Sequence, residues 1–312
     1  MHIPIAQLDL YLKCPRAYKL HLVDKVEPQH TPLSLCKAIT TKTVIAKLHS
    51  FGKPLTEIAD QEIVKLCEEV WNFETSSLPI DKNEFTEVVL QAKPETKTKP
   101  ATPAVTKAEK AFDEIKTWIA GYAKFEKDAK VIYSNVYFED QIGDITFSGY
   151  IDQIRQSPEG GVEIIMFKTG SQSPCLAYLA RDFAISLASH AVWQGRIYPD
   201  VAAEQYIELK QLPVAYCYYL PYLELYKRKN GNAQKGDLKG NPLIPVSRSE
   251  ATLLDFEYEI LHAASGIEAQ YFPMNVANIL GCSACQFAYQ CQTGAEPQML
   301  EKIAEVYETI VN

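Results

Sequence analysis

The stretch VEIIMFKTG, residues 162–170, decides how the rest of the chain is interpreted. Its apolar run ends in lysine, threonine and glycine, which predicts a buried strand that enters a turn. Just upstream, FSGYIDQI, residues 147–154, places Asp152 inside a second strand-like run. An aspartate on one strand and Lys168 on its neighbour are residue types that can hold a catalytic metal and activate a water. Such a site also needs an acid two residues before the lysine, where this sequence has Met166.

The composition favours a cytoplasmic protein that does not enter membranes. The chain has 312 residues, of which 47% are hydrophobic, enough for one large domain or two small ones. Its formal net charge of −8 and isoelectric point of about 5.4 argue against a surface that is basic overall. No apolar run approaches the ~20 residues that span a bilayer, and polar residues interrupt residues 1–20, as they would not in a signal peptide. In the cytoplasm, eight cysteines favour packed thiols or metal ligands over a disulfide framework.

The apolar periodicity predicts helices, then a sheet, then helices again, which is typical of a mixed α/β domain. We expect a single domain over 1–312, with a helical region at 1–128, a core sheet and helix at 129–225, and a basic loop, helices and cysteines at 226–312. Within the first region, the Lys-, Thr- and Pro-rich stretch 93–109 is expected to be flexible. Helices are predicted at 4–13, 33–50, 57–72, 108–125, 179–195 and 248–270 and in the last residues, and strands at 129–140, 144–156, 161–170, 204–212 and 214–225.

A cluster of cysteines near the C-terminus is the strongest local motif. GCSACQFAYQC places Cys282, Cys285 and Cys291 in a C-x2-C-x5-C array, whose three thiolates could converge on one metal centre. Cys14, in YLKCPRAY, is the natural fourth ligand. Spacing alone leaves zinc, an iron–sulfur cluster and a chance grouping open. The remaining cysteines sit singly in apolar or mixed runs and are expected to be packed thiols: Cys36, Cys67, Cys175 and Cys217.

The order of these motifs resembles that of iron–sulfur PD-(D/E)XK nucleases. YLKCPRAYKL, FSGYIDQI, EIIMFKTG and FPMNVANILGCSACQFAYQC follow one another as in the RecB-like family, which includes CRISPR-associated RecB-like exonucleases and the AddB nuclease domain. The resemblance covers about 1–50 and 130–292. It implies a restriction-endonuclease-like core, with a central mixed sheet flanked by helices. It also implies a 4Fe–4S cluster on Cys14, Cys282, Cys285 and Cys291 that clips the two ends of the chain together.

The same resemblance assigns catalytic roles to two residues. Asp152 matches the acid that binds Mg²⁺ or Mn²⁺, and Lys168 matches the lysine that orients the nucleophile and stabilises developing negative charge. Asp152 could instead be a strand aspartate bonded to a backbone amide, and Lys168 a lysine that reaches solvent from a strand end. The sequence leaves both interpretations open for each residue.

Other positions depart from the family pattern. Met166 stands in place of the second acid, and a thioether is a poor ligand for hard cations. In the early G-x-x-x-H helix, Lys37 replaces the glycine and Thr41 the histidine, while His49 lies two turns later. Asn135 falls near the acid of the preceding strand. The Q-x-x-x-Y motif is also absent from 181–192, where His190 could approach the site but is more typical of a packed or surface histidine.

These departures leave two hypotheses. One is a catalytically weakened or silent nuclease-fold protein that acts by binding DNA or a partner, with at most a residual Mg²⁺ or Mn²⁺ at Asp152. The other is an active exonuclease or endonuclease that uses Asp152 and Lys168 with Mg²⁺ or Mn²⁺. Either is compatible with DNA processing beside a helicase, recombination or CRISPR-type partner. The expected DNA contacts lie in the loop 227–242, at Lys227, Arg228, Lys229, Lys235 and Lys239, although a solvated loop is the alternative.

Overall fold

The computed structural model describes residues 1–26, 31–78, 80, 82–90, 103–170, 172–200, 205–224 and 238–275, together with residues 282, 285, 287, 290 and 291. The chain divides into two units. The first contains Met1–His30, Ile142–Phe147 and Asp255–Asn312, and the second contains Thr31–Gln141 and Ser148–Leu254. The expected basic-loop residues at 227, 228, 229 and 235 and the expected final helix lie outside the described residues.

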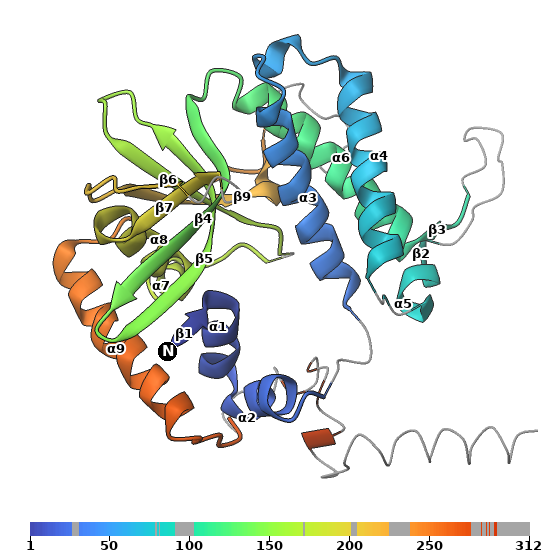
Figure 1. Ribbon diagram of the computed structural model, residues 1–312. Helices are drawn as coiled ribbons and strands as arrows, with labels where there is room; N and C mark the ends of the chain where they lie inside the picture. Colours follow the sequence, from blue (N-terminus) through green and yellow to red (C-terminus); the bar gives the residue numbers. More distant parts are fainter. Residues whose placement is uncertain are drawn as a thin grey trace, which may run out of the picture. The chain divides into compact units, whose positions relative to one another are not determined.

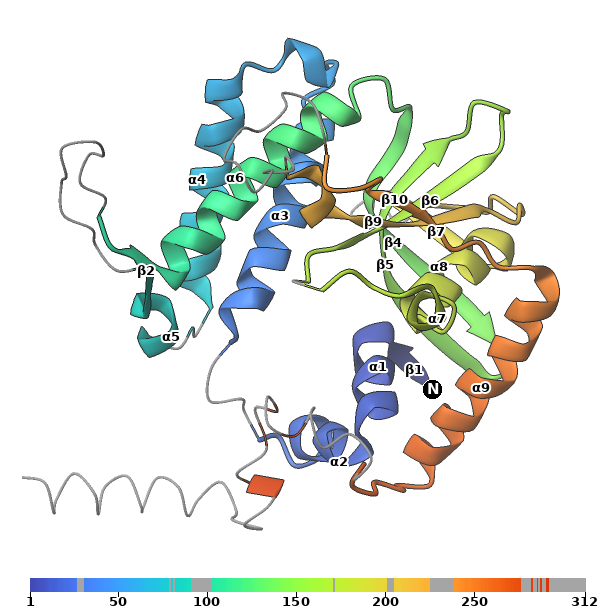
Figure 2. The same cartoon turned by 180° about the vertical axis from the view of Figure 1, so that it is seen from behind.

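A mixed sheet forms the centre of the second unit (Figures 1 and 2). Its path runs β10-β9-β6-β5-β4-β7-β8, with β6 and β9 parallel and the pairs β10–β9, β6–β5, β4–β7 and β7–β8 antiparallel. The predicted α/β class with a mixed sheet flanked by helices is therefore confirmed. The strands are β4 (Val131–Ile142), β5 (Ile145–Gln156), β6 (Val162–Lys168), β7 (Arg196–Asp200), β8 (Gln205–Ile207), β9 (Val214–Tyr219) and β10 (Leu243–Pro245).

Three long helices of the second unit share one core with the sheet. They are α3 (Leu33–Ser50), α4 (Asp60–Ser77) and α6 (Lys107–Phe125), and Figure 1 shows them side by side. Ile165 and Phe167 of β6 join this core, so the alternation of side chains along the strand directs Met166 to the opposite face. On that face, α8 (Phe183–Gln194) packs against β6, β7 and β9.

Helix α6 begins where the sequence provides a capping box. The Glu109 amide donates to Thr106 Oγ1 at 3.2 Å, and the Thr106 amide donates to Glu109 Oε2 at 2.8 Å. Just before it, β3 (Val105–Thr106) pairs with β2 (Val88–Leu90), which follows α5 (Lys82–Thr86). Of the stretch 93–109, residues 93–102 lie outside the described residues, whereas the rest forms β3 and the first turn of α6.

A buried polar network fixes the end of β5 to the helices. Arg155 donates to Glu126 Oε2 at 2.6 Å and to the side-chain oxygen Oε1 of Gln153 at 2.8 and 3.0 Å. The Gln153 amide donates to the hydroxyl of Tyr122 at 2.8 Å, and His49 Nε2 lies 2.7 Å from the same hydroxyl. The partners of Arg155 compensate the cost of burying its charge. The sequence left His49 outside the site, and its contact with Tyr122 agrees with that.

The first unit contains the N-terminal elements and the end of the described chain. They are β1 (His2–Pro4), α1 (Ile5–Lys13), α2 (Pro15–Tyr18), η1 (Lys19–Val23) and the part of α9 (Glu250–Glu268) from residue 255 onward. Long-range hydrogen bonds join its ends: Tyr11 Oη donates to the Tyr271 carbonyl at 2.8 Å, the Arg16 amide donates to the Pro273 carbonyl at 3.2 Å, and Asn275 Nδ2 donates to the Lys13 carbonyl at 2.9 Å. Tyr18 stacks on Phe272 with ring centroids 5.9 Å apart.

Some element boundaries differ from those expected. The strand expected over 214–225 stops at Tyr219, because Pro221 starts a short 3-10 turn, η4 (Leu220–Leu223). The helix expected over 179–195 divides into α7 (Leu176–Leu179) and α8. Strand β7 was not predicted. Across the described residues, no helix is both long enough and apolar enough to cross a membrane.

Candidate active site and cysteine region

Asp152 lies where the backbone pairing of two central strands ends. The ladder between β5 and β6 runs from Gln156 opposite Val162 to Gln153 opposite Ile165. Beyond it, Asp152 Oδ2 accepts a hydrogen bond from the Phe167 amide at 2.7 Å. Only 9% of the residue is exposed, so the carboxylate is largely removed from water. The backbone-bonded aspartate that the sequence left open is therefore present.

The same carboxylate oxygen also carries an ion pair. Lys42, from α3, places its Nζ 2.9 Å from Asp152 Oδ2, and the lysine side chain is 38% exposed. A buried carboxylate needs a compensating charge, and here an ammonium of the chain provides it. A divalent cation would have to compete with Lys42 for this oxygen.

Lys168 forms an ion pair with a carboxylate at the start of α8. Its Nζ donates to Asp182 Oδ2 at 2.7 Å, while Asp182 Oδ1 accepts from the Ile185 amide and thereby caps α8. Burial alone would lower the pKa of Lys168, but the charge and hydrogen bond of Asp182 outweigh it and raise that pKa. The ammonium therefore stays charged and is tied to the start of α8.

The position of the missing second acid is apolar. Met166 is 7% exposed and is the residue that faces Cys217 in the parallel register of β6 and β9. Burial raises the pKa of the Cys217 thiol to about 11, which leaves it neutral at physiological pH. A thioether and a neutral thiol offer little to Mg²⁺ or Mn²⁺, which prefer hard oxygen ligands.

The two altered positions of the early helix are structural. Thr41 is fully buried, and its hydroxyl donates to the Lys37 carbonyl at 2.8 Å within α3. Lys37 pairs with Glu114 at 2.8 Å and lies 4.7 Å above the ring of Trp118. The Thr41 hydroxyl therefore donates its hydrogen bond within α3 and not to Asp152.

The lysines near the predicted catalytic positions, and Lys239, the one described lysine of the basic loop, each have a carboxylate partner. The Trp118 indole donates to Glu224 Oε1 at 3.1 Å, and this hydrogen bond together with Lys239 lowers the pKa of Glu224 although burial opposes the shift. The positive charges of these lysines are thus neutralised in pairs by carboxylates of the chain. The four pairs are Lys37–Glu114, Lys42–Asp152, Lys168–Asp182 and Lys239–Glu224.

The other polar positions considered from sequence do not join Asp152. His190 is buried, and its Nδ1 lies 2.5 Å from Asp140 Oδ2, which agrees with a packed histidine. Asn135 is an exposed residue of β4 with a positive φ of 54°. Asn residues tolerate this left-handed conformation better than most residues, so its side chain serves the backbone geometry of the strand.

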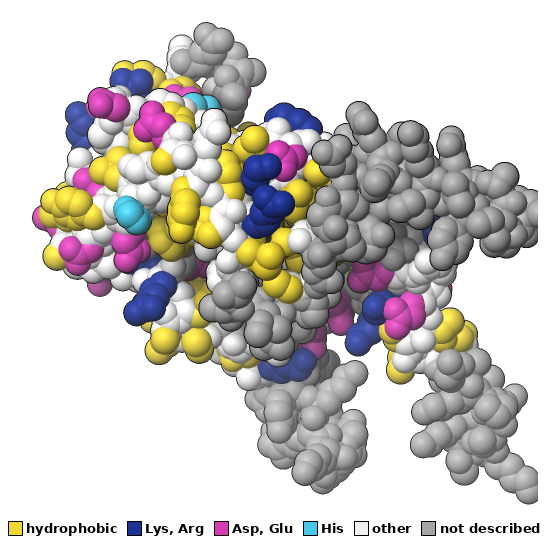
Figure 3. Space-filling model, turned by 90° about the horizontal axis from the view of Figure 1, so that it is seen from below, with side chains coloured by type: hydrophobic (Ala, Val, Ile, Leu, Met, Phe, Trp, Pro, Cys, Tyr) yellow, Lys and Arg dark blue, Asp and Glu magenta, His cyan; other side chains and the backbone are white. Residues whose placement is uncertain are grey.

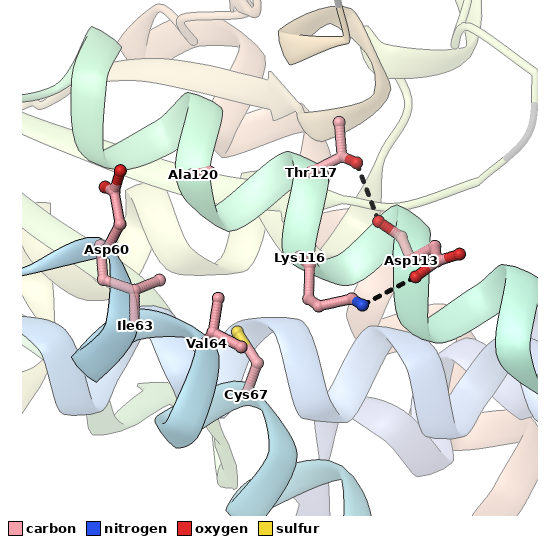
Figure 4. A pocket seen from close by; sticks show the side chains of 8 residues that line it. All are labelled: Asp60, Ile63, Val64, Cys67, Asp113, Lys116, Thr117 and Ala120. Carbon is pink, nitrogen blue, oxygen red and sulfur yellow. Dashed lines mark hydrogen bonds and ion pairs between the residues drawn. The ribbon is translucent and has the colours of Figure 1, made fainter.

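One face of the surface and one cavity of the described residues show how charge is distributed away from Asp152. On the face shown in Figure 3, Lys and Arg side chains are scattered among acidic and apolar ones. A cavity of about 590 Å³ lies between α4 and α6, and Figure 4 shows that Lys116 on its wall pairs with Asp113. Its other walls include the polar residues Asp60 and Thr117 beside apolar ones such as Ile63, and it shares no residue with the Asp152 site.

The four cysteines of the predicted metal centre lie in one unit and gather at one place. Cys14, Cys285 and Cys291 pack against the same small core of Ala17, Leu20, Val26 and Phe287. Burial raises the pKa of Cys291, Arg16 lowers it, and the nearby thiols of Cys14, Cys285 and Cys282 raise it further. Because the other three thiols influence the pKa of Cys291, the four cysteines lie in the same neighbourhood.

The spacing of these thiols does not define the metal. Among the residues that the structure describes, no three Cys, His, Asp or Glu side chains converge closely enough to hold a metal ion. A tetrahedral zinc site with Zn–S bonds of ~2.3 Å needs its sulfurs within about 4 Å of one another. A four-iron cluster is larger than one ion, so its thiolates stand farther apart. The chemistry of the four thiols therefore fits either group and does not choose between them.

Strands β5 and β6 separate at Asp152, and Lys168 ends β6. With helices on both faces of the sheet, this arrangement defines a nuclease-type α/β protein with an altered site. The chain belongs to the PD-(D/E)XK nuclease superfamily, whose family model matches residues 3–292. A comparison with curated proteins finds no match. The superfamily part of the expected resemblance is confirmed, and with it a fold of the kind that processes DNA.

Sequence reasoning missed Lys42 and Asp182, which form the ion pairs with Asp152 and Lys168. Lys42 directly follows Thr41, but a lysine on a helix gives no signal of its partner without the tertiary structure. Asp182 precedes an apolar helix, which is an N-cap signal, yet the expected helix began earlier and absorbed it.

Proposed function

We propose that this protein is a catalytically silent nuclease-fold module that binds DNA. The observation that carries the proposal is the Lys42–Asp152 ion pair, with Lys42 Nζ 2.9 Å from Asp152 Oδ2. The carboxylate that a nuclease would use for its metal already has a cation of the chain as its partner. Beside it, Met166 removes the second acid, so too few oxygen ligands remain to bind Mg²⁺ or Mn²⁺ tightly.

Membership of the superfamily supports DNA as the ligand of this protein. We place the chain in the iron–sulfur RecB-like branch, with a 4Fe–4S cluster on Cys14, Cys282, Cys285 and Cys291. The gathering of these thiols around one small core supports that cluster. Its role there is structural, and a cytoplasmic helicase, recombination or CRISPR-type protein is the kind of partner that such a module would serve.

A nuclease assay tests the silent site. Wild-type protein, Asp152→Ala and Lys168→Ala are incubated with single- and double-stranded DNA and Mn²⁺. The control is Asp128→Ala, since the Asp128 side chain is 89% exposed. We expect no cleavage above background with any of them. Cleavage by the wild type and the control that disappears in both site variants would instead establish the active nuclease that uses Asp152 and Lys168.

Restoring ligands tests whether the fold still has the shape of the site. A histidine at position 41 would overpack the core because Thr41 is fully buried, so the restoration is better made elsewhere. Met166→Asp supplies the second acid, and Lys42→Met removes the competing ammonium. Mn²⁺-dependent cleavage by this double variant, but not by either single variant, would support a lapsed metal site.

Metal analysis tests the cluster. An anaerobic preparation is expected to be brown and to contain about four irons per chain, as four cysteine ligands imply. A colourless protein with one zinc per chain would replace the cluster by a zinc site and would leave the proposal for the Asp152 site unaffected.

A further inference from the structure

Four tyrosine rings form a continuous row across four neighbouring strands of the sheet. Tyr150 of β5 contacts Tyr137 of β4, with ring centroids 5.4 Å apart. Tyr137 contacts Tyr198 of β7 at 5.5 Å, and Tyr198 contacts Tyr206 of β8 at 6.0 Å. The rings are tilted to one another by 51–60°. This set, here called the tyrosine row, follows the strand order β5-β4-β7-β8.

The tyrosine row is open to solvent at both ends. Tyr150 is 52% exposed and Tyr206 is 47% exposed. The two inner rings, Tyr137 and Tyr198, are half-buried. The row therefore lies at the surface of the sheet, and the exposed rings of Tyr150 and Tyr206 can receive a ligand.

The two inner rings are held by one carboxylate. Tyr137 Oη donates to Glu139 Oε1 at 3.2 Å, and Tyr198 Oη donates to Glu139 Oε2 at 2.9 Å. Desolvation and the bonds to Glu139 raise the pKa of both phenols, so they remain neutral donors. The carboxylate in the middle of the row is thus engaged by hydroxyls, and the rings are fixed in orientation before any ligand arrives.

Positive charge accompanies the row at the Tyr206 end. The Arg196 guanidinium lies 4.7 Å from the centroid of the Tyr206 ring, and Arg196 stands opposite Glu139 in the β4–β7 register. An anionic chain laid along the row would therefore meet a cation beside Tyr206.

We propose that the tyrosine row is a binding platform for single-stranded nucleic acid. Unpaired bases stack on the exposed rings of Tyr150 and Tyr206, and Arg196 contacts the phosphates or stacks with a base. A duplex keeps its base faces covered, so stacking selects the single strand. The inference rests on the proposed DNA-binding function and adds the strandedness of the ligand and the surface that receives it.

Fluorescence anisotropy with a labelled 15-nucleotide oligo(dT) tests the platform. Alanine substitution of a stacking aromatic weakens binding by ~1–3 kcal/mol per base, so we expect Tyr150→Ala and Tyr206→Ala each to raise the dissociation constant about tenfold or more. Tyr150→Phe keeps the ring and should stay within about twofold of the wild type, because stacking does not need the hydroxyl. Tyr258→Ala is the matched control, since Tyr258 is 76% exposed on α9 and lies outside the row.

An abasic strand of the same length separates stacking from charge. It keeps the phosphates but lacks the bases, so wild-type protein should bind it about tenfold more weakly than oligo(dT). Equal affinity for the two strands, or unchanged binding by the Tyr150→Ala/Tyr206→Ala double variant, would overturn the platform. Tighter binding of a duplex than of oligo(dT) would also overturn it.

The two proposals fail separately. DNA cleavage by the wild type would reject the silent site, while a base-dependent contribution of the tyrosines would still establish the platform. Absence of cleavage together with binding that ignores the tyrosines would reject the platform and leave the silent site standing.

Discussion

The residues singled out by the sequence fall into two regions that are stabilised differently. Around Asp152 and Lys168, each charged group has a partner within the chain, and the strands rest on a large core. Around Cys14, the described core consists of Ala17, Leu20, Val26 and Phe287, and Cys14 caps α2 without a side-chain hydrogen bond. One region supplies its own counter-charges, whereas the other presents thiols that an external group would join.

The difference in counter-charges suggests a rule for nuclease folds that bind two kinds of metal group, one catalytic and one structural. A catalytic cation can be replaced by an ammonium once catalysis is no longer needed, because the remaining task is to neutralise one carboxylate. The proposed structural cluster could not be replaced so simply, because it would close a loop of nearly the whole chain, and small cores are marginal without such links. The three tryptophans, Trp71, Trp118 and Trp193, all belong to the second unit, so their fluorescence reports on the Asp152 region alone.

The largest effect is expected from removing a proposed cluster ligand. Structural metal sites contribute on the order of 10 kcal/mol to folding, so Cys14→Ala should lose most of the iron and unfold at a much lower temperature. The control is Cys67→Ala, which removes a fully buried thiol from the large core and should cost only ~1–2 kcal/mol. Iron analysis and circular dichroism measure the two variants, and tryptophan fluorescence shows whether the Asp152 region survives. Equal melting temperatures for the two variants would contradict the cluster.

The sequence predicted those elements whose signals are local. The apolar alternation of β4, β5 and β6 and the apolar face of α6 are each contained in one short stretch of sequence, and these four predicted elements formed. Strand β7 escaped because RIYPD is short and contains Pro199, which argues against a strand in a sequence read alone. It forms because Tyr198 and Ile197 pair with β4, a contact that no local pattern contains.

The candidate site was predicted as a set of positions, and its bonding was not. Asp152, Lys168 and Met166 lie on adjacent strands as the resemblance implied. Their partners, Lys42 and Asp182, are 110 and 14 residues away in sequence. The packing of α3 and α8 against the sheet decides which lysine lies beside which carboxylate. These ion pairs could therefore be identified only from the tertiary structure.

A smaller effect is expected from acidification of the Asp152 region. Burial, with a contribution from the Arg155 charge, lowers the pKa of His49 from 6.5 to about 4. Between these two values the unfolded chain binds a proton that the folded chain does not, so the free energy of unfolding should fall as the pH decreases through this range. At 1.36 kcal/mol per pH unit, the loss is at most ~3 kcal/mol.

Urea titrations followed by tryptophan fluorescence between pH 7 and pH 4.5 measure this loss. His49→Gln removes the titrating group and should flatten the dependence by about 2 kcal/mol. The control is His262→Gln, an exposed residue of α9 that should leave the slope as in the wild type. If His49→Gln retained the full wild-type slope, the buried neutral histidine would be refuted.

The smallest expected effect tests the replacement of a metal by Lys42 most directly. Lys42→Met leaves the 8%-exposed carboxylate of Asp152 without its ammonium, and an unsatisfied buried group costs ~1–3 kcal/mol. Because Lys42 is 38% exposed and water can partly solvate the site, we expect the substitution to lower the free energy of unfolding by about 1 kcal/mol. This loss should be smaller when Asp152→Asn is added, because the buried negative charge is then also removed. Lys65→Met, which removes a largely exposed pair with Glu69, should cost at most ~0.5 kcal/mol.

Addition of Mn²⁺ to these variants connects the two regions. In the wild type the Asp152 region is complete without a metal, so Mn²⁺ should leave its urea midpoint unchanged. In Lys42→Met the unpaired carboxylate can accept the cation, and a ligand that binds only the folded state stabilises it by about 2.7 kcal/mol at a hundredfold excess over its dissociation constant. With one carboxylate and no second acid the affinity is expected to be weak, so a recovery of a few tenths of a kcal/mol at millimolar Mn²⁺ is the outcome that fits. Equal stabilisation of the wild type by Mn²⁺ would mean that Lys42 does not occupy the place of the metal, and the Asp152 region would then depend on an external ligand as the cysteine region does.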